Sequence, residues 1–309
     1  KLFPLYLLVG SILIGLFFIQ LYKPKLEFRI ITKVLVVVLL VAFAFQTAGL
    51  GVRWYISGHA PWSNGYESMI YIAWATMLAG FFLMKNSPVT LGVTSMLAGV
   101  TLLTAHMSWL DPEITNLVPV LKSYWLTFHV ATITASYGFL GLACMMGFLN
   151  LCLIVIRRPN NMVRVNLALK ELSLITELSM IVGLILLVIG NFLGGIWANE
   201  SWGRYWGWDP KETWTLVTII LYSFTLHMTL IPSIRNRFTF NFMAVISFGA
   251  VLMTYFGVNY YLSGLHSYAA GDSVPIPSFV YYTLIVLFMV SALAAYNEYT
   301  LKKPEKALD

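Results

Sequence analysis

The chain has 309 residues, of which 59% are apolar, 15% aromatic and 10% charged, and its formal net charge is +6. Soluble domains usually carry about 25% charged residues, so this composition excludes an ordinary cytosolic enzyme, a secreted disulfide-rich domain and a nucleic-acid-binding domain. The apolar residues fall in runs of about 20, the length of helix that crosses roughly 30 Å of hydrocarbon. We therefore expect an all-α polytopic protein whose surroundings are a lipid bilayer.

Nine apolar runs follow one another along the chain, separated by short polar stretches. The fifth run is long enough to project beyond the bilayer or to bend. No repeat, low-complexity tract or long linker interrupts the sequence, so we expect residues 1–309 to form a single transmembrane domain. The expected spans are approximately 2–22, 30–50, 66–84, 88–107, 124–156, 173–197, 212–233, 239–262 and 279–299.

Most of the nineteen lysines and arginines lie in one set of connecting loops. The positive-inside rule makes that set cytoplasmic, which places the amino terminus outside and the carboxyl terminus inside. This set consists of Lys23, Lys25, Arg29, Lys33, Lys85, Arg157, Arg158, Arg164, Lys170, Arg235, Arg237, Lys302, Lys303 and Lys306. The opposite side has Lys1, Arg53, Lys122, Arg204 and Lys211.

The start of the chain is unusual for a membrane protein. It begins with Lys1 rather than Met, lacks a signal peptide and places its first residue outside. A preceding polypeptide would account for all three features, so we expect either the carboxyl-terminal part of a longer protein or a numbering that omits a leader.

The tryptophans are concentrated on the outer side. Nine of the ten lie in or beside the outer loops, and Trp74 is the exception. Interfacial tryptophans normally form belts at both membrane surfaces, so this one-sided distribution indicates a binding surface for a large, flat, apolar ligand. Arg204 or Lys211 would pair with carboxylates of that ligand. Within an outer segment of about 197–214, the expected contacts are Trp202, Arg204, Tyr205, Trp206, Trp208, Asp209 and Trp214.

Part of this segment also has a structural interpretation. Asp209 fits an N-cap, Pro210 the first helical position and Glu212 the third. Together they predict a capping box that opens the seventh span.

The histidines indicate what the ligand is. His129 lies a few residues into the fifth span, and His266 follows the eighth. A lone histidine in a membrane protein is often hydrogen-bonded packing, but two at outer helix ends beside a tryptophan-rich loop fit the axial ligands of a heme iron. His227 lies seventeen residues past Pro210, about 25 Å along a helix and toward the inner leaflet, where an ionisable side chain indicates function. The roles of His59 and His106 stay open.

The run from Trp202 to Trp214, Trp-Gly-Arg-Tyr-Trp-Gly-Trp-Asp-Pro-Lys-Glu-Thr-Trp, resembles the signature of the CcsA/ResC family. These are heme-handling proteins of System II cytochrome c biogenesis. The resemblance extends to Lys122–Leu126, which precedes His129, to Gly264–Ala269, which includes His266, and to Pro61–Ser68. It therefore covers most of the chain between residues 50 and 270.

The resemblance implies a role for each histidine and a set of partners. His129 and His266 would hold an external heme b as cargo, and His227 would belong to an inner heme site. The second ligand of that inner site would come from CcsB (ResB), either a separate subunit or a fused preceding half. The chain would then be part of a cytochrome c synthase, or heme lyase, in a bacterial inner membrane or a thylakoid membrane. Apocytochrome c and thiol-reducing proteins would be its other partners.

The expected function is to move heme from the inner-leaflet site to the external bis-histidine site and to present its vinyl groups to the Cys-x-x-Cys-His motif of apocytochrome c. This would be catalysis by positioning, and no residue is expected to act as a general base. Two alternatives stay open. A membrane b-type cytochrome or quinol-oxidising subunit would hold its hemes deep in the bilayer, and a cofactor-free permease would use the tryptophans as interface anchors.

Overall fold

The computed structural model describes residues 1–84, 87–107, 110–114, 123–265 and 276–302. Within these ranges the secondary structure is helical and contains no strand, and nine helices are long and apolar enough to cross a membrane. Both findings confirm the expected fold class. The spanning helices are α1 (Phe3–Tyr22), α2 (Arg29–Ser57), α3 (Gly65–Leu83), α4 (Pro88–His106), α5 (Tyr124–Ile156), α6 (Met162–Trp202), α7 (Pro210–His227), α8 (Arg237–Leu252, continued by α9, Val258–Tyr261) and α10 (Ser278–Lys302).

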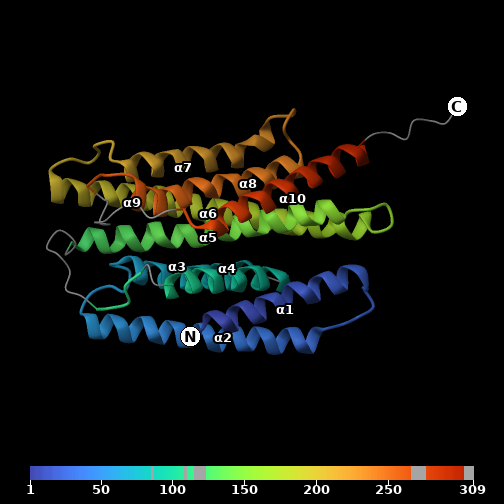
Figure 1. Cartoon of the computed structure of the whole chain (residues 1–309), viewed down its shortest axis with the longest axis horizontal. Helices are drawn as coiled ribbons and strands as arrows, with labels where there is room; N and C mark the ends of the chain where they lie inside the picture. Colours follow the sequence, from blue (N-terminus) through green and yellow to red (C-terminus); the bar gives the residue numbers. More distant parts are fainter. Residues whose placement is uncertain (85–86, 108–109, 115–122, 266–275, 303–309) are drawn as a thin grey trace.

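Successive helices reverse direction, so the connecting loops alternate between the two ends of the bundle (Figure 1). One end carries loops 58–64 and 203–209, and we call it the tryptophan end. The opposite end carries loops 23–28, 157–161 and 231–236. The assignment of the tryptophan end to the outside of the membrane remains a prediction from the distribution of cations.

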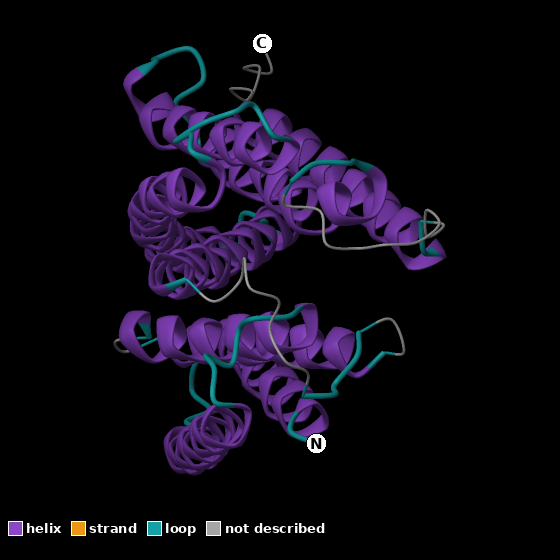
Figure 2. Cartoon of the chain, turned by 90° about the vertical axis from the view of Figure 1, so that its left-hand side faces the viewer, coloured by secondary structure: helices purple, strands orange, loops and turns teal. Residues whose placement is uncertain are grey.

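The helices form two groups that lie side by side, α1–α4 and α5–α10 (Figure 2). Helix α5 is central: it packs against α6, α8 and α10 in its own group and against α3 and α4 in the other. The cavity described below lies where these groups meet, at the tryptophan end.

Helix α6 is longer than its apolar run predicts, because it begins at Met162 rather than near residue 173 and ends at Trp202. Its first turns are amphipathic: Val165, Leu169 and Leu172 are buried at helical spacing, while Lys170 is exposed. The continuous apolar run begins only after these amphipathic turns, so hydropathy alone places the start of the helix too late. Gly203 then adopts a left-handed conformation with φ of 70° and ends the helix.

Glycines on α6 allow α5 to pack very closely against it. A Cβ atom at Gly183 would lie 2.6 Å from Leu140 Cδ2, and one at Gly190 would lie 2.8 Å from Ile133 Cδ1. Small residues permit such backbone approach between membrane helices. Consequently the half of α5 nearer the tryptophan end lies directly against the backbone of α6.

A π-helical turn over Met253–Gly257 connects α8 to α9. Such turns shift the direction in which side chains point and are frequent at functional sites. Here Thr254 Oγ1 lies 3.4 Å from Thr218 Oγ1 on α7, and the Tyr255 hydroxyl lies 2.6 Å from the Ser68 hydroxyl on α3. The turn therefore joins both helix groups beneath the tryptophan end.

Candidate functional site

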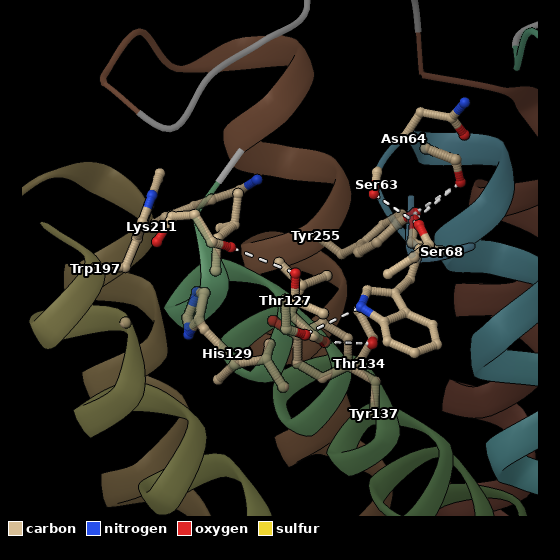
Figure 3. Close-up of a pocket in the computed structure, with 18 of the residues that line it drawn as sticks. Ser63, Asn64, Ser68, Thr127, His129, Thr134, Tyr137, Trp197, Lys211 and Tyr255 are labelled. Carbon is tan, nitrogen blue, oxygen red and sulfur yellow. Dashed lines mark hydrogen bonds between the residues drawn. The ribbon is translucent and has the colours of Figure 1, made fainter. Parts of the chain in front are cut away.

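A cavity of about 1100 Å³ lies at the tryptophan end, between α3, α5, α6, α7 and the π-helical turn (Figure 3). Small-molecule sites usually measure about 300–1,000 Å³, so this cavity suits a large ligand. Its walls are rich in aromatic side chains, which can pack against a flat apolar molecule. These are Trp54, Trp62, Tyr124, Tyr137, Trp197, Tyr205, Trp206, Tyr255 and Tyr260.

His129 lines the cavity from the second turn of α5. Its Nδ1 lies 2.7 Å from the Gly190 carbonyl oxygen on α6, an acceptor that requires the proton on Nδ1. In this tautomer the lone pair is on Nε2. A histidine that binds a metal through one nitrogen commonly donates from the other to a carbonyl or carboxylate, which fixes the ring orientation.

Two residues of α6 hold the His129 ring from the side. Trp197 is buried and stacks beside it, with ring centroids 6.2 Å apart and an interplanar angle of 15°. A Cβ atom at Gly194 would lie only 2.6 Å from His129 Cε1. Position 194 therefore needs glycine for the imidazole to occupy its place.

The donor set fits heme iron better than a bare metal ion. Within the described ranges, no three His, Cys, Asp or Glu side chains are grouped so that they could hold a metal ion. A porphyrin supplies four nitrogens of its own, so its iron needs only axial ligands from the protein. One oriented imidazole in an aromatic cavity therefore fits one axial position.

His266, the expected second ligand, lies outside the described residues. The two residues just before it, Gly264 and Leu265, are described, and both contact Asp209 of the 203–209 loop. The Leu265 backbone N–H donates to Asp209 Oδ2 at 2.6 Å. Gly264 also packs against this carboxylate, because a Cβ atom there would lie 2.4 Å from Oδ2.

The predicted capping box at the start of α7 is confirmed. Glu212 also organises the whole 203–209 loop: its Oε1 accepts from Arg204 Nη1 at 3.2 Å, and its Oε2 accepts from the backbone N–H groups of Gly207 at 2.7 Å and Asp209 at 3.2 Å. Between those two N–H groups, Trp208 has a φ of 58°, in the left-handed region that non-glycine residues rarely adopt. The carboxylate of Glu212 therefore holds a strained turn.

The strained turn separates the predicted aromatic contacts into two sets. Tyr205, which is 65% exposed, and Trp206 line the cavity together with His129. Trp208, which is 69% exposed, is not part of the lining. Trp202 packs against Trp197 at 4.8 Å between ring centroids, outside the cavity lining. The predicted contacts that do not line the cavity are Trp202, Arg204, Trp208, Asp209 and Trp214.

The 58–64 loop, whose residues were not among the predicted ligand contacts, forms the opposite wall of the cavity. Trp62 Nε1 donates to the Thr127 carbonyl on α5 at 3.0 Å. Buried Glu67, in the first turn of α3, holds this loop much as Glu212 holds the 203–209 loop: it pairs with Arg53 at 2.7 Å and accepts from the Ser63 N–H at 2.9 Å. Asn64 caps α3 by accepting from the Glu67 N–H. The Asn64-x-x-Glu67 spacing, which matches Asp209-x-x-Glu212, was the available signal.

The other histidines lie in three different places. His59 lines the cavity, with Nδ1 3.2 Å from the Ala60 carbonyl oxygen. His106 is not part of the cavity lining, and its Nε2 lies 2.9 Å from Lys1 Nζ. His227 is the last residue of α7, where it is exposed on the outside of the bundle with Nδ1 2.7 Å from the Ser223 carbonyl oxygen.

Comparison with known proteins gives consistent matches. The family model described as cytochrome C assembly protein matches residues 62–266. Protein NrfI of Wolinella succinogenes is 48% identical over 272 residues, which cover 88% of this chain and 30% of NrfI. The cytochrome c biogenesis proteins CcsA of a Prochlorococcus marinus strain and of Guillardia theta are 33% and 32% identical, covering 72% and 71% of this chain and 80% of each relative. The chain thus spans less than a third of NrfI but most of CcsA.

Proposed function

We propose, because this chain belongs to the cytochrome C assembly protein family, that it receives heme b near the inner leaflet and presents it at the outer surface for attachment to apocytochrome c. The relatives support a role in cytochrome c biogenesis. The orientation of His129 and the position of His227 support the finer steps. The heme lyase role, in a bacterial inner membrane or a thylakoid membrane, is part of the same proposal.

The observation that carries the proposal is the orientation of His129 in the aromatic cavity. Its Nδ1 proton is committed to the Gly190 carbonyl, so Nε2 is the nitrogen that would ligate iron. His266 would supply the second axial ligand of the same heme. Two imidazoles fill both axial positions, keep oxygen from the iron and fix the ring.

The aromatic walls would bind the faces and edges of the macrocycle. Trp197 comes from α6, Trp206 from the 203–209 loop and Trp62 from the 58–64 loop. Flat rings bury large apolar area in such surroundings. The aromatic walls would also exclude water from the faces of the heme. One edge of the heme would stay accessible to the incoming peptide.

The attachment step would be catalysed by positioning. Each apocytochrome thiol adds across one vinyl group: the sulfur bonds to the carbon next to the ring, and the hydrogen goes to the terminal carbon. Nothing leaves and no net proton is released, so holding the vinyl edge beside the two cysteines is the main requirement. The cavity walls and His129 would supply that fixed geometry.

The inner site would be shared with a partner. His227 is exposed on the outside of the bundle, where a helix of another polypeptide can approach it. An ionisable side chain in this position is expensive unless it has a functional partner. A CcsB-like helix packed against α7 would supply the second axial ligand.

Heme counting tests the proposal most directly. The chain would be purified with and without its CcsB-like partner, and bound heme measured by pyridine hemochrome. We expect a bis-histidine spectrum, with more heme per chain when the partner is present. Purified protein without Soret absorbance would favour a permease, and reduction of the heme by quinol would favour a respiratory cytochrome.

The two tryptophans of the strained turn give a matched pair of variants. Trp206→Ala removes a cavity wall, a loss of about 2 kcal/mol or roughly 30-fold in heme affinity. Trp208→Ala removes a side chain that is 69% exposed, so a much smaller loss is expected. The measurements are heme occupancy and thioether yield in protein that still inserts. Equal loss in the two variants, or full activity in Trp206→Ala, would contradict the assignment.

A further inference from the structure

The segment 197–214 contains two cationic residues, Arg204 and Lys211, at the same end of the bundle. The two side chains differ in their interactions with acidic residues. Arg204 pairs with Glu212 at 3.2 Å. Lys211 lines the cavity and is half-buried. Its ammonium group makes no hydrogen bond or ion pair with any residue in the described part of the chain.

The carboxylates nearest to Lys211 in the sequence are already used by other groups. Both oxygens of Glu212 accept hydrogen bonds, from Arg204, Gly207 and Asp209. The two oxygens of Asp209 accept from the backbone N–H groups of Lys211 and Leu265. The Asp209 carboxylate attracts the Lys211 ammonium but makes no hydrogen bond with it. A partly desolvated ammonium is costly, and an anionic group on a ligand in the cavity would lower that cost by pairing with it directly.

We propose that Lys211 binds a carboxylate of the ligand in this cavity and thereby sets which edge of that ligand faces α7. The inference rests on the proposed function, in which the ligand is heme b. Heme b carries two propionate carboxylates along one edge of the macrocycle and its vinyl groups toward the other. An ion pair at Lys211 therefore orients the whole ring.

The opposite wall, formed by the 58–64 loop, contributes no Lys or acidic side chain to the described part of the cavity lining. Lys211 lies across the cavity from Ser63 and Asn64 of the 58–64 loop (Figure 3). On that side the lining includes Trp54, His59 and Trp62. Among the described residues that line the cavity, the Lys and acidic side chains are Lys211 and Glu212, both on α7. With the propionates at α7, the vinyl groups face the 58–64 loop, which becomes the side where apocytochrome thiols approach.

The experiment compares two ligands that differ only in their carboxylates. Heme-depleted full complex would be titrated with heme b and with its dimethyl ester, and binding followed in the Soret band. The proteins are the unmodified complex, Lys211→Met, Lys211→Arg, and Lys23→Met as a control in a loop at the opposite end. The ratio of the two affinities, compared between variants, cancels differences in how the two ligands partition into detergent.

We expect Lys211→Met to weaken heme b binding on the order of 10- to 100-fold, the effect of a hydrogen bond to a charged group. Binding of the ester should not change, because the ester has no charge to pair. Lys211→Arg should keep most of the preference, and Lys23→Met all of it.

Two results would overturn the assignment of Lys211. Equal weakening of both ligands in Lys211→Met would mean that the side chain only shapes the wall, and unchanged binding of both would mean that it does not contact the ligand. Failure of the unmodified complex to bind either ligand is a different result, because it would overturn the proposed function itself.

Discussion

Replacing His129 with Ala should abolish cytochrome c maturation and change the heme spectrum. The variant removes the imidazole whose orientation is fixed by the Gly190 carbonyl, Trp197 and the absence of a side chain at Gly194. Heme iron would then have at most one protein ligand at the outer site, and the ring would lose its fixed position. Added imidazole should partly restore both the spectrum and maturation, because it can occupy the vacated coordination position within the cavity.

Two comparisons make this result specific. His106→Ala removes a histidine from the same end of the bundle that does not line the cavity, and it should mature cytochromes normally. His266→Ala should reproduce the His129→Ala phenotype, including rescue by imidazole, if both residues ligate one heme. Unchanged spectra and maturation in His129→Ala would eliminate the external bis-histidine site.

The number of spanning helices could be predicted because long apolar runs have few alternatives in a membrane. The ends of α6 could not be predicted in the same way. Val165 and Leu169 are buried in its first turns, but those turns are amphipathic, and their polar residues lower the mean hydropathy. The capping box at Asp209 was also predictable, because its spacing alone specifies the hydrogen bonds.

The set of residues that line the cavity was harder to predict from the sequence. Trp62 and Tyr255 are distant along the chain and line the same cavity only because the two helix groups pack together. The different environments of Trp206 and Trp208 depend on the φ of 58° at Trp208. No residue pattern in the segment predicts this left-handed backbone conformation. The pattern indicated the end of the bundle at which the cavity lies, but not which rings of the motif line that cavity.

His227→Ala should starve the outer site of heme while leaving that site chemically intact. His227 is at the opposite end of α7 from Lys211 and the cavity, so its removal should not disturb His129. In the proposed route, heme from the cytoplasm first binds between His227 and a partner ligand. Without that inner binding site, heme is lost before it reaches the outer surface. The expected result is a large fall in heme content and maturation of the full complex.

Two further measurements separate a lost inner binding site from a damaged protein. Heme added from the outside should still bind to His227→Ala with the spectrum of the unmodified outer site. Leu230→Ala, a matched change at an outward-facing position close to His227 that is 76% exposed, should keep cytoplasmic loading if the imidazole rather than general packing against the partner is required.

The decisive quantity is the heme content of the outer site when the full His227→Ala complex is supplied only from the cytoplasm. A structural role for the exposed His227 is the alternative, because the bond between its Nδ1 and the Ser223 carbonyl oxygen of its own helix satisfies one ring nitrogen. Normal loading would therefore show that His227 has this structural role and that heme reaches His129 by another path. Depleted loading, together with normal binding of externally supplied heme, would place His227 on the route.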